Sequence, residues 1–226
     1  MTRTILEAVR ERIRRASERS GRSEKDITLI AISKKVQQVD ILEAVSFGLH
    51  HFGESYVQEA WEKIEAIKGQ AATWHMIGHL QTNKAARAVQ IFDVIQSVDS
   101  LKLLGAMDHA AGDLKKIQEC FIELKVSEEL TKGGLKETEI ESFLDKAREL
   151  KNIRIAGLMT IAPFFDSPRD TRPYFKKARK IFEKLFIDKI GPKPELSMGM
   201  SSDFQTAIEE GSTMVRVGQA IFGPRV

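Results

Sequence analysis

The chain alternates between short, almost wholly apolar runs and longer segments whose apolar residues recur every three or four positions. Apolar runs bounded by turn residues are typical of strands buried on both faces, and the longer spacing is typical of helices with one buried face. Residues 4–20 have the helical spacing and stop before Gly21. We expect strands at eight runs: 27–34, 50–54, 73–78, 94–98, 120–126, 153–160, 195–200 and 214–218.

A helical pattern follows each of these runs except the last. The expected helices cover 39–47, 57–67, 84–90, 101–111, 137–150, 174–186 and 204–210. A repeated strand–helix unit implies a parallel sheet, and eight units predict an α/β fold of the closed (β/α)8 TIM-barrel type, with an extra N-terminal helix. A doubly wound open sheet is the alternative. The chain has 226 residues, so we expect one barrel domain over 1–226.

Composition narrows the class of protein. Hydrophobic residues make up 42% of the chain and charged residues 30%, which is typical of a soluble globular protein. The 35 basic and 32 acidic residues give a net charge of only +3, which does not call for a nucleic-acid partner. No apolar segment approaches membrane-spanning length. One cysteine, Cys120 in an apolar run, excludes an internal disulfide. We therefore expect a cytoplasmic protein with Cys120 buried in its core.

The first expected strand ends on a lysine, Lys34, in the stretch AISK at 31–34. In a parallel barrel the carboxyl ends of the strands form the active face. Apolar surroundings there disfavour an ammonium ion and favour the neutral amine that a Schiff base requires. Lys34 is thus a candidate for carbonyl chemistry. The alternative is a solvated lysine at the beginning of a loop.

Small and polar residues after the last two strands indicate an anion site. Ser201 and Ser202 come just before a helix, where hydroxyls and unbonded backbone N–H groups point outward. Gly218 permits a close approach of the backbone, and the helix or turn beginning at Gln219 adds donors. Barrels often hold a phosphate between these two loops. Ser202 or Asp203 can instead be a simple helix N-cap, which is compatible with an anion site.

Two further residues stand out inside the apolar strands. An arginine is costly within a strand unless it is paired, so we expect Arg216 to contact a ligand or a buried carboxylate. His75 is more simply a hydrogen-bonded core residue than a functional group. The histidines and the cysteine lack the spacing of metal ligands, so no metal site is expected.

A lysine after the first strand and a phosphate site after the last two fit an aldehyde-bearing phosphate ester, and pyridoxal 5′-phosphate (PLP) is the obvious candidate. The chain carries AISK at 31–34, FGESYVQE at 52–59, WHMIGHLQTNK at 74–84, GLMTI at 157–161, LSMGMSSD at 196–203 and GSTMVRVGQAIFG at 211–223. These motifs, in this order, resemble the pyridoxal phosphate homeostasis family over nearly the whole chain.

The resemblance implies a barrel like the N-terminal domain of alanine racemase, with PLP bound as a lysine aldimine on Lys34. It implies that Arg216 contacts the pyridine nitrogen. It also implies which residues hold the phosphate: Ser201, Ser202, Gly218 and Gln219. Lys132 in TKGG matches a second lysine that family members place after strand five.

The chain departs from the family pattern at three positions. Ser55 stands where the family usually has asparagine, which puts a ligand contact there in doubt. Val36 stands where a further lysine is common, with Lys35 beside it instead. Gln219 replaces the usual threonine or serine, so a hydroxyl contact to the phosphate is lost while the backbone N–H remains.

Three functions compete: a non-catalytic carrier or regulator of intracellular vitamin B6, a PLP-dependent amino-acid racemase, and a nucleic-acid-binding domain. Racemisation needs an acid/base on each face of the substrate carbanion. In alanine racemases the second base is a tyrosine of a separate C-terminal domain, and neither Tyr56 nor Tyr174 lies at a clear strand end. We therefore expect a carrier and no enzyme, with racemase as the alternative. The expected partners are PLP and PLP-dependent apo-enzymes, with no nucleic acid, no membrane and a monomeric state.

Overall fold

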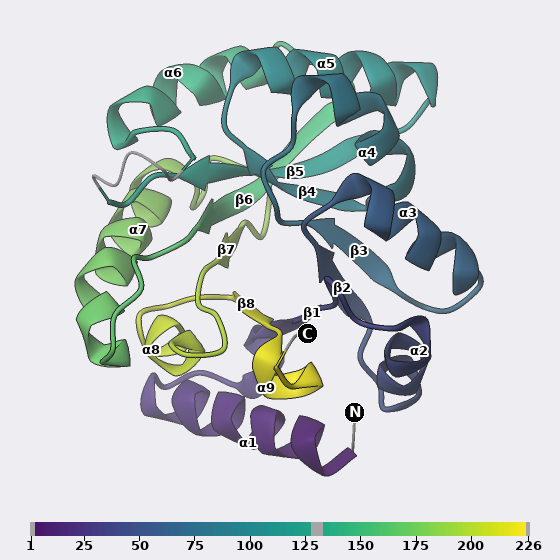
Figure 1. Cartoon of the computed structure of the whole chain (residues 1–226). Coiled ribbons are helices and arrows are strands. Elements are labelled where there is room, and N and C mark those ends of the chain that lie inside the picture. Colours follow the sequence, from purple (N-terminus) through teal and green to yellow (C-terminus); the bar gives the residue numbers. More distant parts are fainter. Residues whose placement is uncertain (1–2, 128–132, 225–226) are drawn as a thin grey trace.

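Eight parallel strands close into a barrel in the computed structural model, which describes residues 3–127 and 133–224 (Figure 1). The strands are β1 Thr28–Ile32, β2 His51–Glu54, β3 Thr73–Met76, β4 Val94–Val98, β5 Gln118–Leu124, β6 Ile153–Thr160, β7 Glu195–Ser197 and β8 Met214–Val217. Each pairs with the next along the chain, and β8 pairs with β1. The predicted closed barrel is confirmed, and the open-sheet alternative is excluded.

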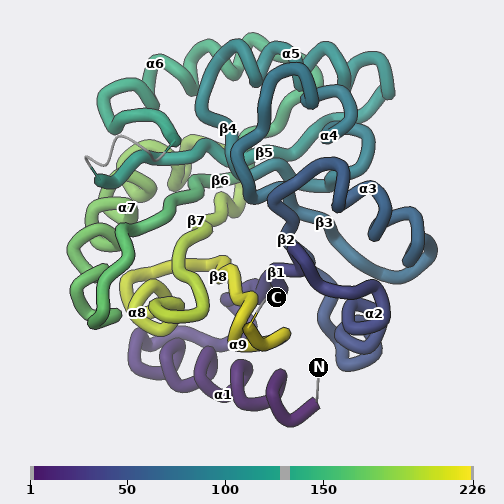
Figure 2. Tube along the Cα trace, viewed as in Figure 1, coloured from purple at the N-terminus to yellow at the C-terminus, as the bar shows by residue number. Residues whose placement is uncertain are grey.

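Helices surround this barrel (Figure 2). They are α1 Arg3–Arg19, α2 Gln38–Ser46, α3 Val57–Ala66, α4 Ala85–Ile91, α5 Leu101–Asp113, α6 Glu137–Ala147, α7 Arg172–Leu185, α8 Phe204–Glu209 and α9 Gln219–Phe222. Three 3-10 turns, η1 Glu24–Asp26, η2 Thr82–Lys84 and η3 Pro168–Thr171, join some of the elements. A short helix, α9, thus follows β8, where the sequence predicted either a helix or a turn beginning at Gln219.

Five predicted strands, those at β1, β3, β5, β7 and β8, are too long at their carboxyl ends, and the residues beyond each strand lie outside the barrel wall. β1 stops at Ile32, because the chain turns through Lys35, whose φ of 59° is left-handed. β7 stops at Ser197, because Gly199 has a φ of 95°. β3 ends at Met76, so Gly78 lies in the following loop. Lys34 is therefore on a loop beyond the barrel wall.

The N-terminal helix α1 lies against the short helices α8 and α9, which come from the other end of the chain (Figures 1 and 2). Its apolar side is buried, and Arg12 stacks over the Phe204 ring at 4.4 Å from the ring centre. Arg19 pairs with Glu209 at 2.7 Å. These contacts place α1 beside the loops that follow β7 and β8.

The core has two parts. A large cluster fills the space between the barrel and its helices, and a smaller one fills the barrel interior. The buried members of the smaller cluster are Ile30, Ile32, Val94, Phe121, Met159 and Met214. Cys120 belongs to the larger cluster and is fully buried, which confirms its interpretation as a core residue; burial raises the pKa of its thiol.

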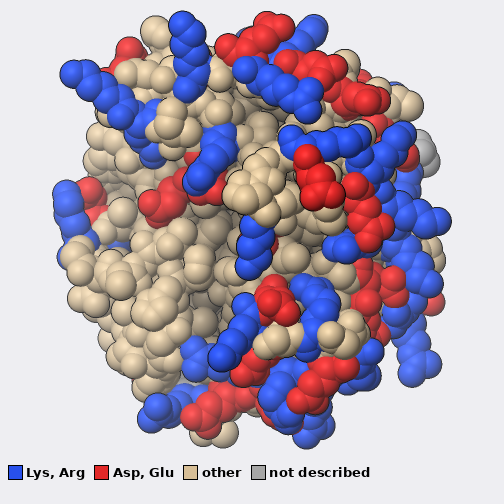
Figure 3. Space-filling model, turned by 180° about the vertical axis from the view of Figure 1, so that it is seen from behind, with Lys and Arg blue, Asp and Glu red and all other residues tan. Residues whose placement is uncertain are grey.

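Charged side chains of both signs lie on one face of the molecule. On the face that Figure 3 shows, basic and acidic groups lie next to one another over most of the charged area. Among the described residues, no helix has the length and apolar character needed to cross a membrane.

Candidate functional site

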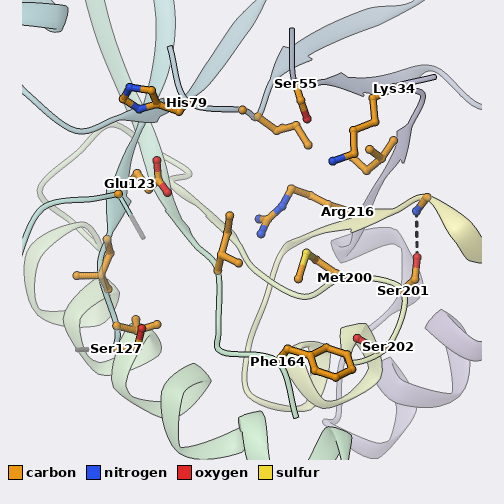
Figure 4. A pocket seen from close by; sticks show the side chains of 18 of the residues that line it. Lys34, Ser55, His79, Glu123, Ser127, Phe164, Met200, Ser201, Ser202 and Arg216 are labelled. Carbon is orange, nitrogen blue, oxygen red and sulfur yellow. Dashed lines mark hydrogen bonds between the residues drawn. The ribbon is translucent and has the colours of Figure 1, made fainter. Parts of the chain in front are cut away.

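A cavity of about 1000 Å³ opens at the carboxyl ends of the barrel strands (Figure 4). Its walls come from the last residues of β1, β5 and β8 and from the loops that follow β1, β2, β3, β5, β6, β7 and β8. All six residues that the sequence proposed for a cofactor line it: Lys34, Ser201, Ser202, Arg216, Gly218 and Gln219. Residues up to 185 positions apart thus meet at the end of the barrel where function is expected.

Two cationic side chains extend into this cavity from different directions. Lys34 enters from the loop after β1 and is half-buried, and Arg216 enters from β8 (Figure 4). Ile32, Ile77 and Ile161 provide apolar wall around them. Lys34 therefore lies at a partly apolar wall of the cavity, and its reaction with a carbonyl group stays a prediction.

Ser201 and Gly218 join the loops after β7 and β8. The Gly218 N–H donates to the Ser201 Oγ at 3.1 Å (Figure 4). Because the hydroxyl oxygen accepts this bond, its own proton can be donated to another acceptor. Ser202 and Gln219 beside them are exposed at the cavity wall. Asp203, not Ser202, is the N-cap residue of α8, and its carboxylate accepts the Met200 N–H at 2.6 Å.

Arg216 is almost fully buried and is held by the barrel. Its guanidinium donates to the Ser197 Oγ and to the Thr160 carbonyl, both at 2.8 Å. Burial lowers the pKa of Arg216 to about 10, opposed by the nearby carboxylates of Asp203 and Glu123, so the group stays charged at neutral pH. The expected contact of Arg216 with a ligand or a buried carboxylate stays a prediction, since the hydrogen bonds above go to a hydroxyl and a backbone carbonyl, although Arg216 does line the cavity.

Arg216 is also one end of a polar column through the barrel interior. Ser197 donates to Gln96 Oε1 at 2.7 Å, Gln96 Nε2 contacts His75 Nδ1 at 3.0 Å, and His75 Nε2 contacts His51 Nδ1 at 3.1 Å. His51 is the first residue of β2, at the opposite end of its strand from the cavity. Burial lowers the pKa of His75 to about 3. The interpretation of His75 as a hydrogen-bonded core residue is confirmed.

An acidic part of the cavity wall lies on the other side from Lys34. Glu123 at the end of β5 is 9% exposed, and burial, with help from Asp99, raises its pKa to about 7. His79 lies 3.5 Å from Asp99. Sequence reasoning missed Glu123 and His79. The signal for Glu123 was present, because it is a charged residue within an apolar strand, as Arg216 is.

The remaining candidates have mixed outcomes. Ser55 lines the cavity. Lys35 is exposed and Val36 is buried, and neither of these two residues lines the cavity. Lys132 lies outside the described residues. Within the described chain no group of histidine, cysteine or carboxylate side chains has the arrangement of a metal site.

Comparison with known proteins identifies the family. Residues 5–226 match the model of the alanine racemase N-terminal domain family. The chain is 41% identical, over 97% of its length and 96% of the relative's, to the pyridoxal phosphate homeostasis protein of Aquifex aeolicus (strain VF5). The chain belongs to the pyridoxal phosphate homeostasis protein family. Another family member, from Escherichia coli (strain K12), is 35% identical over 97% of this chain and 95% of that protein.

Solved structures agree with this assignment. PipY of Synechococcus elongatus PCC7942, in the structure with PLP bound, has a TM-score of 0.82 and 38% identity and covers 95% of this chain and 100% of that one. Alanine racemase of Clostridium difficile 630 has a TM-score of 0.73 at 14% identity, over 95% of this chain and 55% of the racemase. The second likeness shows the fold alone. The sequence-based resemblance to this family is thus confirmed.

Proposed function

We propose that this protein binds PLP in the cavity and serves PLP homeostasis as a carrier or regulator, without turning over a substrate. The observation that carries the proposal is that Lys34 lines the same cavity as Ser201 and Gly218, which are hydrogen-bonded to each other. Relatives at 33–41% identity are named for PLP homeostasis, and the PipY structure holds PLP.

The residues fit the chemistry of PLP. Its aldehyde condenses with a primary amine and releases water, and Lys34 supplies the amine. The phosphate requires hydrogen-bond donors, which the Ser201 hydroxyl and the backbone from Gly218 to Gln219 supply, with Ser202 beside them. On this proposal the cofactor is held as an aldimine of Lys34.

Arg216 suits holding the cofactor better than activating it. If the pyridine nitrogen of PLP were held beside the buried Arg216 guanidinium, a second positive charge there would be disfavoured and the ring nitrogen would stay unprotonated. An unprotonated ring is a weaker electron sink and gives less help to carbanion formation.

The position of the tyrosines separates a carrier from a racemase. The chain has two tyrosines. Tyr56 is 61% exposed, and Tyr174 packs beside Phe165 with ring centres 5.6 Å apart. Within the described structure neither lines the cavity. Because a lost general acid or base costs roughly 10²–10⁴-fold in rate, we expect at most trace racemisation.

Borohydride reduction of the PLP-treated protein tests the proposal. Peptide mapping should find the reduced adduct on Lys34, and Lys34→Ala should abolish the adduct and the associated absorbance. An adduct on Lys35 or Lys132 with Lys34 unmodified would overturn the assignment. Incubation with L- and D-alanine should leave chirality unchanged. Racemisation at several turnovers per second that depends on Lys34 would establish the enzyme instead.

We further propose that the loaded protein is monomeric and delivers PLP to PLP-dependent apo-enzymes. Mixing it with such an apo-enzyme should restore that enzyme's activity, and Lys34→Ala protein treated in the same way should not. A mass measurement by light scattering tests the monomeric state. Activation no faster than that by the free PLP released from the carrier would exclude direct delivery.

A further inference from the structure

The backbone on both sides of Lys34 is tied to two neighbouring elements. On one side, the Ser33 Oγ donates to Glu54 Oε1 at 2.7 Å, and the Ser33 carbonyl accepts the Lys63 ammonium at 2.5 Å. On the other side, the Lys35 N–H donates to Glu59 Oε1. Glu54 ends β2, whereas Glu59 and Lys63 are in α3. The turn that carries Lys34 is thus held at both of its flanking residues.

Lys63 is the centre of this arrangement. Its ammonium group also contacts Glu54 Oε1 at 2.8 Å and Glu59 Oε1 at 2.6 Å, so it connects both carboxylates to the Ser33 carbonyl. It is 6% exposed and is the one buried lysine among the described residues. All three of its contacts are to groups that themselves hold the Ser33–Lys35 turn or are part of it.

Burying these charged groups costs desolvation free energy, so the cluster contributes little to the stability of the fold. Burial raises the pKa of Glu54, against the influence of Lys63, and the second oxygen of Glu54 has no hydrogen bond in the described part of the chain. Buried ion pairs are often no better for stability than apolar side chains of the same size. Lys35 is moreover held with a φ of 59°, which non-glycine residues rarely adopt. Backbone strain that persists next to buried charges is typical of a functional site at which the position of a side chain must be fixed.

We infer that Lys63, acting with Glu54 and Glu59, is a positioning residue that fixes the loop of Lys34 so that its amine meets the aldehyde of PLP. The inference rests on the proposed function. Lys63 does not line the cavity that holds Lys34, so it acts on that lysine through the backbone of Ser33 and, by way of Glu59, through the backbone of Lys35. A reactive group displaced by about 1 Å loses on the order of 10²-fold in rate.

Two ligands separate positioning from binding. PLP uses both the phosphate site and the Lys34 amine, whereas pyridoxine 5′-phosphate has an alcohol in place of the aldehyde and uses the phosphate site alone. The main variant is Lys63→Met combined with Glu54→Gln, because it removes the cation without leaving its carboxylate charged and buried. Glu59→Ala tests the Lys35 side, and Glu62→Ala, an exposed carboxylate of the same helix, is its matched control.

We expect the double variant to form the Lys34 adduct with PLP at least about tenfold more slowly, while its affinity for pyridoxine 5′-phosphate stays within about twofold of the parent's. Glu59→Ala should show the same selective loss, and Glu59→Gln, which keeps an acceptor oxygen for the Lys35 N–H, should restore most of it. Glu62→Ala should behave as the parent protein. Equal losses for both ligands, or no loss for either, would overturn the inference.

Amide hydrogen exchange provides a readout that is independent of the cofactor. In the ligand-free protein, the amides of Lys35 and Val36 should exchange faster in Glu59→Ala and in the double variant, while those of α1 are unchanged. Unaltered exchange at Lys35 would refute the positioning role whether or not PLP binds. Failure of the parent protein to bind PLP would refute the proposed function alone, because the exchange result stands by itself.

Discussion

Replacing Ser201 by alanine tests the phosphate site without touching the Lys34 amine. The hydroxyl accepts the Gly218 N–H at 3.1 Å, so its own proton remains to be donated to an anion. The variant loses this one donor and leaves the Gly218 N–H free. A hydrogen bond to a charged group contributes roughly 1.5–3 kcal/mol. The dissociation constant for PLP should therefore rise roughly 10- to 150-fold.

The assay compares PLP with pyridoxal, which has the aldehyde but no phosphate. Titration followed by absorbance gives both dissociation constants for the parent protein and for Ser201→Ala. Pyridoxal should bind more than tenfold more weakly than PLP to the parent, and the variant should affect PLP alone. An unchanged thermal midpoint serves as the control for folding. If the variant weakens PLP and pyridoxal by the same factor, Ser201 does not hold the phosphate and the reasoning from bond direction is wrong.

Three further predictions concern stability. Burial raises the pKa of Glu123 to about 7, so the folded state binds this proton more tightly than the unfolded state. The free energy of unfolding, measured in urea, should therefore fall by about 2–3 kcal/mol as the pH rises from 4.5 to 7, and Glu123→Gln should abolish this fall. Gln96→Leu leaves polar atoms of His75 and Ser197 unpaired and should cost about 1–3 kcal/mol by the same measurement, which an unchanged midpoint would contradict. Gly199→Ala should lower the thermal midpoint, since its Cβ would lie 2.5 Å from that of Ala207 at a φ of 95°; a folded variant with the parent's midpoint would refute this.

The sequence predicted the fold well because periodicity reports burial. The bounds of β4 and β6 agree with the apolar runs at 94–98 and 153–160. The errors at β1 and β7 have one cause. A buried run continues whether or not the backbone stays extended, and Ser33 and Met198 are fully buried although they lie beyond the ends of β1 and β7. Composition therefore did not mark where hydrogen-bonded pairing stops.

The candidate site could be predicted where each residue carries its own signal. Lys34, Ser201 and Gly218 follow strands, and strand order alone brings them to one end of the barrel. The Lys63 cluster gave no such signal, because a lysine in an amphipathic helix looks like any solvated residue. Its burial depends on how α3 packs against β2. Register between distant strands likewise decides that Gln96 meets Ser197, 101 positions further along the chain.

The polar column in the barrel interior has a fixed direction. A guanidinium only donates, so Ser197 must accept from Arg216 and pass its own proton towards Gln96. The amide nitrogen of Gln96 then donates to His75 Nδ1, so the proton of His75 is on Nε2. His75 Nε2–H in turn donates to His51 Nδ1. Both imidazoles are therefore neutral Nε2–H tautomers. The charge of one arginine thus determines the location of every exchangeable proton along the column, as far as the far end of β2.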